Sequence, residues 1–176
     1  MTRVVCIGDS ITAGQHLDDG VAAWPEHLPG VTAYAKGVPG DTTRLGLERF
    51  PRDVQGIEPD VVIIQFGHND ANRWQTDRGL PRVSLAAFVA NLEEMLDRAA
   101  AFGMEPVLCT LTPSFRPEPH PTDCRAYDAM IRAVAARRDV RLADVSGLDE
   151  SHALDGIHLN DAGQRAFAAI VAPMLP

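Results

Sequence analysis

The chain has 176 residues, of which 45% are hydrophobic and 23% are charged, proportions that are typical of an ordinary globular protein. This length fits one domain, and we predict a single domain over residues 1–176. The net charge of −8 argues against nucleic acid as the main partner, because phosphate binding needs concentrated Lys and Arg. Since no apolar stretch approaches the roughly 20 residues that span a bilayer, we expect no membrane partner either.

Cysteine usage and the N-terminal sequence give an expectation about location. The first strand-like run begins at Arg3, which leaves no room before it for a secretory leader. Three cysteines are present, and Cys6 and Cys109 lie inside apolar runs, which favours buried thiols over a disulfide framework. We therefore expect a cytoplasmic protein, or one from which a leader was removed.

Five short apolar runs predict buried strands at residues 4–7, 31–35, 61–66, 106–111 and 140–143. Helical spacing of apolar residues predicts helices at 84–102, 123–138 and 161–174, with Ser84 as an N-cap of the first. Alternation of strands and helices favours a parallel sheet covered on both faces, and five strands favour a three-layer, flavodoxin-like α/β fold. The proline-rich segment 112–122 is predicted to be a stiff loop after the fourth strand.

Polar residues that could do chemistry follow the predicted strands. They are "GDS" at 8–10, "KGVPGDTT" at 36–43, "GHND" at 67–70 and "LDESHALDGIHLN" at 148–160. In an open parallel sheet, ligands bind just beyond the carboxyl ends of the strands. We therefore expect these segments to meet at one edge of the sheet.

Ser10 is a candidate nucleophile. Serine needs a neutral imidazole to take its proton, and the imidazole needs an acceptor that fixes its tautomer. Asp155 and His158 offer both partners three residues apart, but Asp149 and His152 repeat the same spacing upstream. Spacing alone does not distinguish the two pairs.

An oxyanion in such a site needs preorganised hydrogen-bond donors. Three are available: the N–H of Ser10 at the start of a predicted helix, the N–H of Gly40 in a turn, and the side-chain amide of Asn69.

The blocks "GDSITAG", "GVPGDTT", "GHND" and "DGIHLNDAG" resemble, in order and approximate spacing, the four signature blocks of the SGNH hydrolases, also called the GDSL family. The resemblance extends from residue 4 to about residue 165. The segment "AAWPEHL", residues 22–28, further resembles the small bacterial thioesterase and lysophospholipase branch. The resemblance implies Ser10 as nucleophile, Gly40 and Asn69 as oxyanion donors, and Asp155 and His158 as the rest of a triad, with no cofactor and no metal.

The chain departs from the family pattern in places. The second block usually carries Asn where this chain has Ala35. His68 stands before Asn69, as in some carbohydrate esterases of the family, which hints at an acyl-sugar substrate. We choose His158 over His152 as the base because "HLNDAG" runs directly into the last predicted helix, as the family pattern requires.

The sequence therefore predicts a serine hydrolase that cleaves carboxylic esters or thioesters of small molecules through an acyl-enzyme, with short acyl groups. A carbohydrate O-acetylesterase or an acyltransferase with the same triad is an alternative, and a non-enzymatic binding module on the same fold is another. A phosphate site is disfavoured by the absence of a Gly-rich phosphate motif, and a metal site by the absence of a short ligand-spaced cluster. Predicted substrate-lining residues are His68, Trp74, Phe115 and His120. The sequence does not indicate an oligomeric state.

Overall fold

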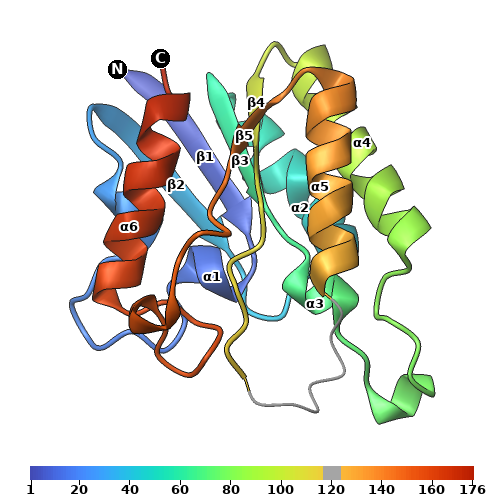
Figure 1. Ribbon diagram of the computed structural model, residues 1–176. Coiled ribbons are helices and arrows are strands. Elements are labelled where there is room, and N and C mark those ends of the chain that lie inside the picture. The colour runs from blue at the N-terminus through green and yellow to red at the C-terminus, as the bar shows by residue number, and fades with distance from the viewer. Residues whose placement is uncertain (117–123) are drawn as a thin grey trace.

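The computed structural model describes residues 1–116 and 124–176 and contains one five-stranded sheet (Figure 1). Its strands are β1 (Thr2–Gly8), β2 (Val31–Gly37), β3 (Val61–Gln65), β4 (Glu105–Cys109) and β5 (Arg141–Ala143). They lie in the order β2-β1-β3-β4-β5, and each neighbouring pair is parallel. This is the flavodoxin-like order, so the predicted fold class is confirmed.

Six α-helices connect or flank the strands in the described part of the chain. They are α1 (Ser10–Ala13), α2 (Thr43–Asp53), α3 (His68–Ala71), α4 (Leu85–Ala101), α5 (Cys124–Arg138) and α6 (Asp161–Val171). Short 3₁₀ turns occupy η1 (Trp24–His27), η2 (Gln55–Ile57), η3 (Gln75–Asp77), η4 (Glu150–His152) and η5 (Ala172–Met174). Among the described residues, no helix combines the length and the apolar character that crossing a membrane requires.

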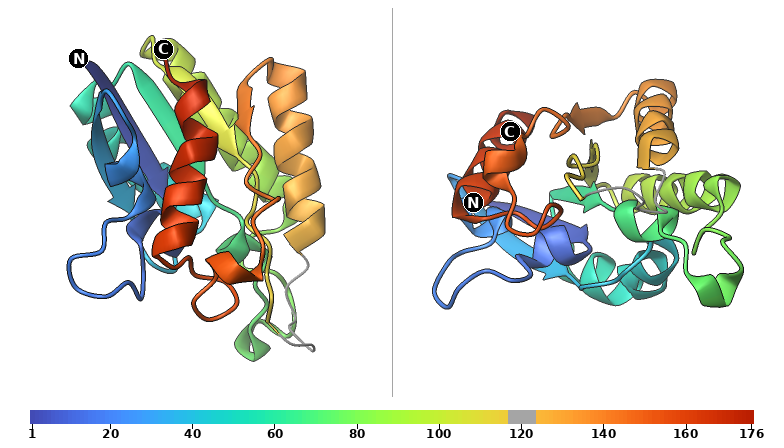
Figure 2. Two further views of the ribbon diagram at one scale, coloured as in Figure 1. Left: turned by 60° about the vertical axis from the view of Figure 1, so that its left-hand side comes forward. Right: turned by 60° about the horizontal axis from the view of Figure 1, so that its bottom comes forward.

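Helices cover both faces of the sheet, and Figure 2 shows the resulting layers. On one face, Val5 and Ile7 of β1 pack in a core that includes buried side chains of α2, α4 and α5. On the other face, Val4 and Cys6 pack with α6 and with Trp24, whose ring stacks on that of Phe167 at 4.7 Å between centroids. This alternation explains why β1 is apolar at consecutive positions, because both of its faces are buried.

The bounds of several predicted elements need correction, among them the last helix, which ends at Val171 and not at 174. The fourth strand ends at Cys109, not at 111, because the Leu111 N–H turns away to the Asp128 carboxylate, 2.9 Å distant. The third strand ends at Gln65. Helix α2 was not predicted by residue range, although the Thr42 hydroxyl caps it.

Strand register aligns the ends of the central strands. Gly8, at the end of β1, is paired with Gly37 of β2 on one side and with Gln65 of β3 on the other. The segments that follow these three strands therefore begin at the same level of the sheet. This alignment brings residues from three parts of the chain to one edge.

Candidate active site

Ser10 lies at the first turn after β1. Asp9 precedes it as the N-cap of α1, where its Oδ1 accepts the Ile11 N–H at 2.9 Å. No acceptor among the described residues takes the Ser10 N–H, as expected for the first residue of a helix. A side chain at Gly8 would place its Cβ 2.1 Å from Thr12 Oγ1 and 2.7 Å from the Gln65 carbonyl oxygen, so this tight turn requires glycine.

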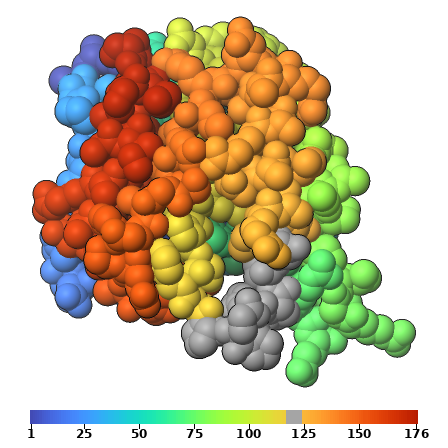
Figure 3. Space-filling view, viewed as in Figure 1, coloured from blue at the N-terminus to red at the C-terminus, as the bar shows by residue number. Residues whose placement is uncertain are grey.

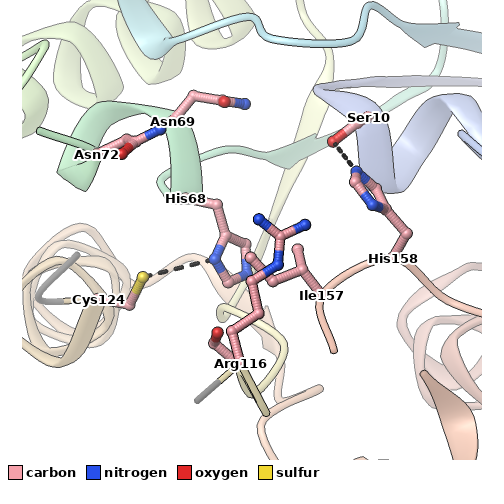
Figure 4. Close-up of a pocket in the computed structure, with 9 residues that line it drawn as sticks. Ser10, His68, Asn69, Asn72, Arg116, Cys124, Ile157 and His158 are labelled. Carbon is pink, nitrogen blue, oxygen red and sulfur yellow. Dashed lines mark hydrogen bonds between the residues drawn. The ribbon is translucent and has the colours of Figure 1, made fainter. Parts of the chain in front are cut away.

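His158 meets Ser10 from the other end of the chain. Its Nε2 lies 3.1 Å from Ser10 Oγ, and its Nδ1 lies 2.8 Å from Asp155 Oδ2. Asp155 Oδ1 also accepts the backbone N–H groups of His158 and Ile157, at 2.9 and 3.1 Å. The three side chains thus form one hydrogen-bonded chain from carboxylate to hydroxyl (Figure 4 shows the Ser10 end).

The Asp155 carboxylate is held in its charged form. Partial burial acts to raise its pKa, but the hydrogen bonds from the backbone and imidazole of His158 and from the Ile157 N–H outweigh it, so the pKa falls well below its ordinary value. An ionised acceptor at Nδ1 keeps the proton there and leaves Nε2 able to accept a proton from Ser10.

The loop that carries this pair is tied to the start of α6. Asn160 caps that helix by accepting the Gly163 N–H at 2.9 Å, and its Nδ2 donates to the Ser151 carbonyl at 2.7 Å. The His152 carbonyl accepts the Asn160 N–H at 3.0 Å and lies only 2.3 Å from where a Cβ on Gly163 would be. Asn160 therefore connects the start of α6 to the 151–152 part of the loop through its side chain and its backbone.

The second Asp-x-x-His pair, Asp149 and His152, forms the same contact between its two side chains but does not hydrogen-bond to Ser10. His152 Nδ1 is 2.9 Å from Asp149 Oδ1, within the 3₁₀ turn η4. The imidazole that accepts a hydrogen bond from Ser10 Oγ is that of His158. The structure therefore brings Asp155 and His158 to Ser10, and not the upstream pair.

Asn69 lines the cavity beside Ser10, whereas Gly40, the other predicted oxyanion donor, is not among the residues that line it. Asn69 belongs to α3, which follows β3 directly, and its side chain extends toward the Ser10 side of the pocket (Figure 4). Gly40 has a φ of +82°, which favours glycine, and Arg82 holds its carbonyl at 2.8 Å. Neither the Asn69 amide nor the Gly40 N–H donates to another described residue, and of the two only Asn69 lines the cavity.

Asp70 joins the two segments that carry these donors. Its carboxylate accepts the Thr43 N–H at 3.0 Å, which links α3 to the start of α2, three residues after Gly40. Burial raises the pKa of Asp70 to about 6, although the Thr43 hydroxyl and N–H act in the opposite direction. Asp70 is thus a buried cross-link beneath the site.

A small cavity of about 110 Å³ opens beside Ser10 (Figure 4). Its lining residues are Ser10, His68, Asn69, Asn72, Ser114, Arg116, Cys124, Ile157 and His158. Sequence reasoning did not name Asn72, Ser114 or Cys124. Asn72 had a signal only in its closeness to Asn69, since it is the residue that directly follows α3.

The predicted lining residues have different positions. His68 lines the cavity, where its Nε2 lies 3.1 Å from Thr112 Oγ1. Trp74 does not; it lies in a separate depression, with the Arg82 guanidinium 4.4 Å from the centre of its ring. Phe115 does not line the cavity either, and its N–H binds the Gly156 carbonyl at 2.7 Å. His120 lies outside the described residues.

Phe115 misses the cavity because of local geometry. The segment after β4 runs along the 148–160 loop, and Figure 3 shows the two side by side. Ser114 and Arg116 line the cavity, whereas Phe115 between them does not, the pattern that results when neighbouring side chains point to opposite sides. Arg116 also donates to Asp155 Oδ2 at 3.1 Å.

One group of His, Cys, Asp and Glu side chains in the described part of the chain has spacing suited to a metal ion. It consists of His16, Asp155 and His158.

A Ser-His-Asp chain at the carboxyl edge of a flavodoxin-like sheet is the arrangement of a serine hydrolase. The family comparison agrees: residues 6–166 match the GDSL-like lipase/acylhydrolase family, and the chain belongs to this family.

Individual relatives extend this finding. The chain is 29% identical to an acetylxylan esterase from Xylanibacter ruminicola over 97% of its own length and 42% of that protein. It is 28% identical to the esterase TesA from Pseudomonas aeruginosa, over 98% of this chain and 87% of that protein. The chain thus spans less than half of the first relative and most of the second.

Solved structures give the same fold. The lipase/acylhydrolase from Enterococcus faecalis superposes with a TM-score of 0.81 at 28% identity, covering 99% of this chain and 95% of that one. The acetyl xylan esterase AlAXEase superposes with a TM-score of 0.82 at 20% identity, covering 99% of this chain and all of that one, and here the likeness is one of fold.

Proposed function

We propose that this protein is a serine esterase that cleaves short-chain acyl esters through an acyl-enzyme. The observation that carries the proposal is the hydrogen-bonded chain from Asp155 through His158 to Ser10, which opens on a cavity with an uncommitted amide at Asn69. Each component of acyl transfer is available there: a nucleophile, a base with a fixed tautomer, and oxyanion donors.

In the first half-reaction, Ser10 Oγ attacks the acyl carbon while its proton passes to His158 Nε2. Asp155 stabilises the imidazolium and keeps the Nδ1 proton in place. The carbonyl electron pair moves onto oxygen, which receives hydrogen bonds from the N–H groups of Ser10 and Gly40 and from the Asn69 amide. Collapse re-forms the carbonyl, and His158 gives its proton to the departing alcohol oxygen.

In the second half-reaction, water takes the place of the alcohol. His158 removes a proton from water as its oxygen attacks the Ser10 ester, and the same donors hold the second oxyanion. Collapse breaks the bond to Ser10 Oγ, which regains a proton from His158. The products are a carboxylic acid and the free enzyme.

Cavity size supports a short acyl group. The cavity beside Ser10, of about 110 Å³, is small against the roughly 300–1,000 Å³ of pockets that hold drug-sized ligands. An acetyl or propionyl group fits this space, whereas a fatty acyl chain would extend out of it. Thioesters of the same acyl groups remain within the proposal because the attack is the same.

A sugar O-acetyl ester is the second candidate. The polar side chains of Asn72, Ser114 and Arg116 on the lining suit a hydroxyl-rich alcohol. The similarity to an acetylxylan esterase over 97% of this chain supports the same direction. An acyltransferase would use this triad with a second alcohol in place of water.

A substrate panel tests the proposal. We expect p-nitrophenyl acetate and butyrate to be hydrolysed with much higher kcat/KM than the palmitate, and Ser10→Ala to be inactive on all of them. Acetylated xylo-oligosaccharides and acetyl-CoA in the same assay separate the sugar-ester and thioester alternatives. Preference for palmitate would contradict the size argument, and full activity of Ser10→Ala would contradict the mechanism.

A cytoplasmic location is also part of the proposal. It is supported by the cysteines, which form no disulfide within the described residues, and by the burial of Cys6 and Cys109 in the core. Fractionation of cells that express the chain in its natural gene context tests it.

A further inference from the structure

His16 is a second imidazole beside the base, and the proposed mechanism does not use it. Its ring packs edge-on against that of His158, with centroids 4.8 Å apart and an interplanar angle of 83°. The residue is exposed and has a φ of +68°, a left-handed conformation that is uncommon outside glycine. This turn after α1 brings the ring of His16 to the loop that carries His158.

Together with Asp155, these rings form a ligand set. One ligand atom from each of His16, Asp155 and His158 can be chosen so that all three lie within 4.8 Å of one another. Two imidazoles and one carboxylate are the donors that Zn²⁺ commonly takes in proteins. Bond lengths of about 2.1 Å in a tetrahedral site put ligand atoms about 3.4 Å apart, so closure from separations of up to 4.8 Å needs a shift of up to about 1.4 Å, which the exposed His16 side chain can supply.

A metal ion must compete with the triad's own hydrogen bonds, in which His158 Nδ1 lies 2.8 Å from Asp155 Oδ2 and His158 Nε2 lies 3.1 Å from Ser10 Oγ. The other contacts of these side chains are weak. Arg116 donates to Asp155 Oδ2 at 3.1 Å, but the two side chains are 36% and 37% exposed, and exposed ion pairs contribute little. Gln15 Nε2 lies 3.2 Å from His16 Nε2 at the surface. A divalent cation can displace both partners.

We propose that His16, Asp155 and His158 form a binding site for Zn²⁺ and similar divalent transition-metal ions, and that occupation of this site inhibits the enzyme. A metal ion on His158 Nε2 occupies the lone pair that accepts the Ser10 proton, and a metal ion on Nδ1 requires the Nδ1 proton to move to Nε2, which leaves no lone pair there. The ring then no longer accepts the Ser10 proton. The inhibition rests on the proposed function, whereas the metal binding does not.

Calorimetric titration with Zn²⁺ tests the binding on tag-free protein. We expect one site in the wild type and in Ser10→Ala, and an affinity at least about tenfold weaker in His16→Ala. His152→Ala is the matched control, because His152 pairs with Asp149 in the same spacing but belongs to no such group of three among the described residues. Arg116→Gln should bind Zn²⁺ more tightly, because it removes the cation that competes for Asp155.

Inhibition is measured separately with p-nitrophenyl acetate. Zn²⁺ should inhibit the wild type and His152→Ala alike, inhibit His16→Ala only at concentrations at least about tenfold higher, and be reversed by EDTA. Equal Zn²⁺ affinity of the wild type and His16→Ala would overturn the proposal, and so would equal sensitivity to inhibition. If the metal-free protein did not hydrolyse p-nitrophenyl acetate, the proposed function would be refuted. The metal site would still be decided by the calorimetric comparison of the wild type with His16→Ala.

Discussion

Asp9 gives the chain an unusual predicted dependence of stability on pH. Its side chain is fully buried, and its Oδ2 has no hydrogen-bond partner among the described residues. Burial raises the pKa of Asp9 from 3.8 to about 7, with the Ile11 N–H acting in the opposite direction and the nearby Asp70 charge adding to the rise. The folded protein therefore holds this proton more tightly than the unfolded chain does.

The sign and size of the effect follow from linkage. A raised pKa in the folded state adds stability that is fully present below pH 3.8 and is lost as the pH rises through about 7. Since one pH unit corresponds to about 1.4 kcal/mol, the loss attributable to Asp9 is about 4 kcal/mol. This is a large part of the 5–15 kcal/mol by which typical domains are stable.

Asp9→Asn isolates this effect. The amide oxygen of Asn can still accept the Ile11 N–H, and the side chain carries no charge at any pH. We expect urea unfolding to show that the variant gains about 4 kcal/mol relative to the wild type between pH 4 and pH 8. Because other carboxyls titrate in both proteins, the difference between the two curves is the quantity to measure. A difference that is flat across this range would refute the reasoning.

Three further predictions concern the site and its scaffold. Asn69→Ala should lower kcat by about 10²–10³ with an unchanged circular dichroism spectrum, because one oxyanion donor is lost; a kcat within twofold of the wild type would remove Asn69 from the mechanism. His158→Ala should abolish esterase turnover while His152→Ala keeps it, and the reverse result in the same steady-state assay would reassign the base. Gly163→Ala should lower the free energy of unfolding by about 1–3 kcal/mol, because its Cβ would lie 2.3 Å from the His152 carbonyl oxygen. Gly147→Ala, with open space around the new Cβ, is the control in thermal unfolding, and equal Tm values would contradict the packing argument.

The strands were predictable because their apolar runs are continuous, as strands buried on both faces must be. Helix α2 was harder to find, because it contains Pro51 and begins inside a polar block that also forms the turn at Gly40. The end of β4 was also missed, since its last apolar residue, Leu111, is buried without being part of the sheet. The sequence therefore predicts an element well where a continuous buried apolar run forms it, and poorly where polar residues or a proline interrupt the run.

The contact of Ser10 with the 148–160 loop that carries His158 was predictable, because parallel strands end at the same edge of the sheet and both segments follow strands. The choice between His152 and His158 could not come from spacing, because each pairs with its own Asp. Cavity lining was the least predictable feature. It depends on which side chains of the segment after β4 point into the cavity, and the neighbouring residues Phe115 and Arg116 differ in this: only Arg116 lines the cavity.

The most direct test of the account is covalent labelling with a fluorophosphonate, read by peptide mass spectrometry. If the His158 imidazole activates the Ser10 hydroxyl, the wild type gains one adduct, on the peptide that contains Ser10, and His158→Ala loses most of it while His152→Ala keeps it. Absence of the adduct from the folded wild type, or an adduct on another serine, would contradict the central claim.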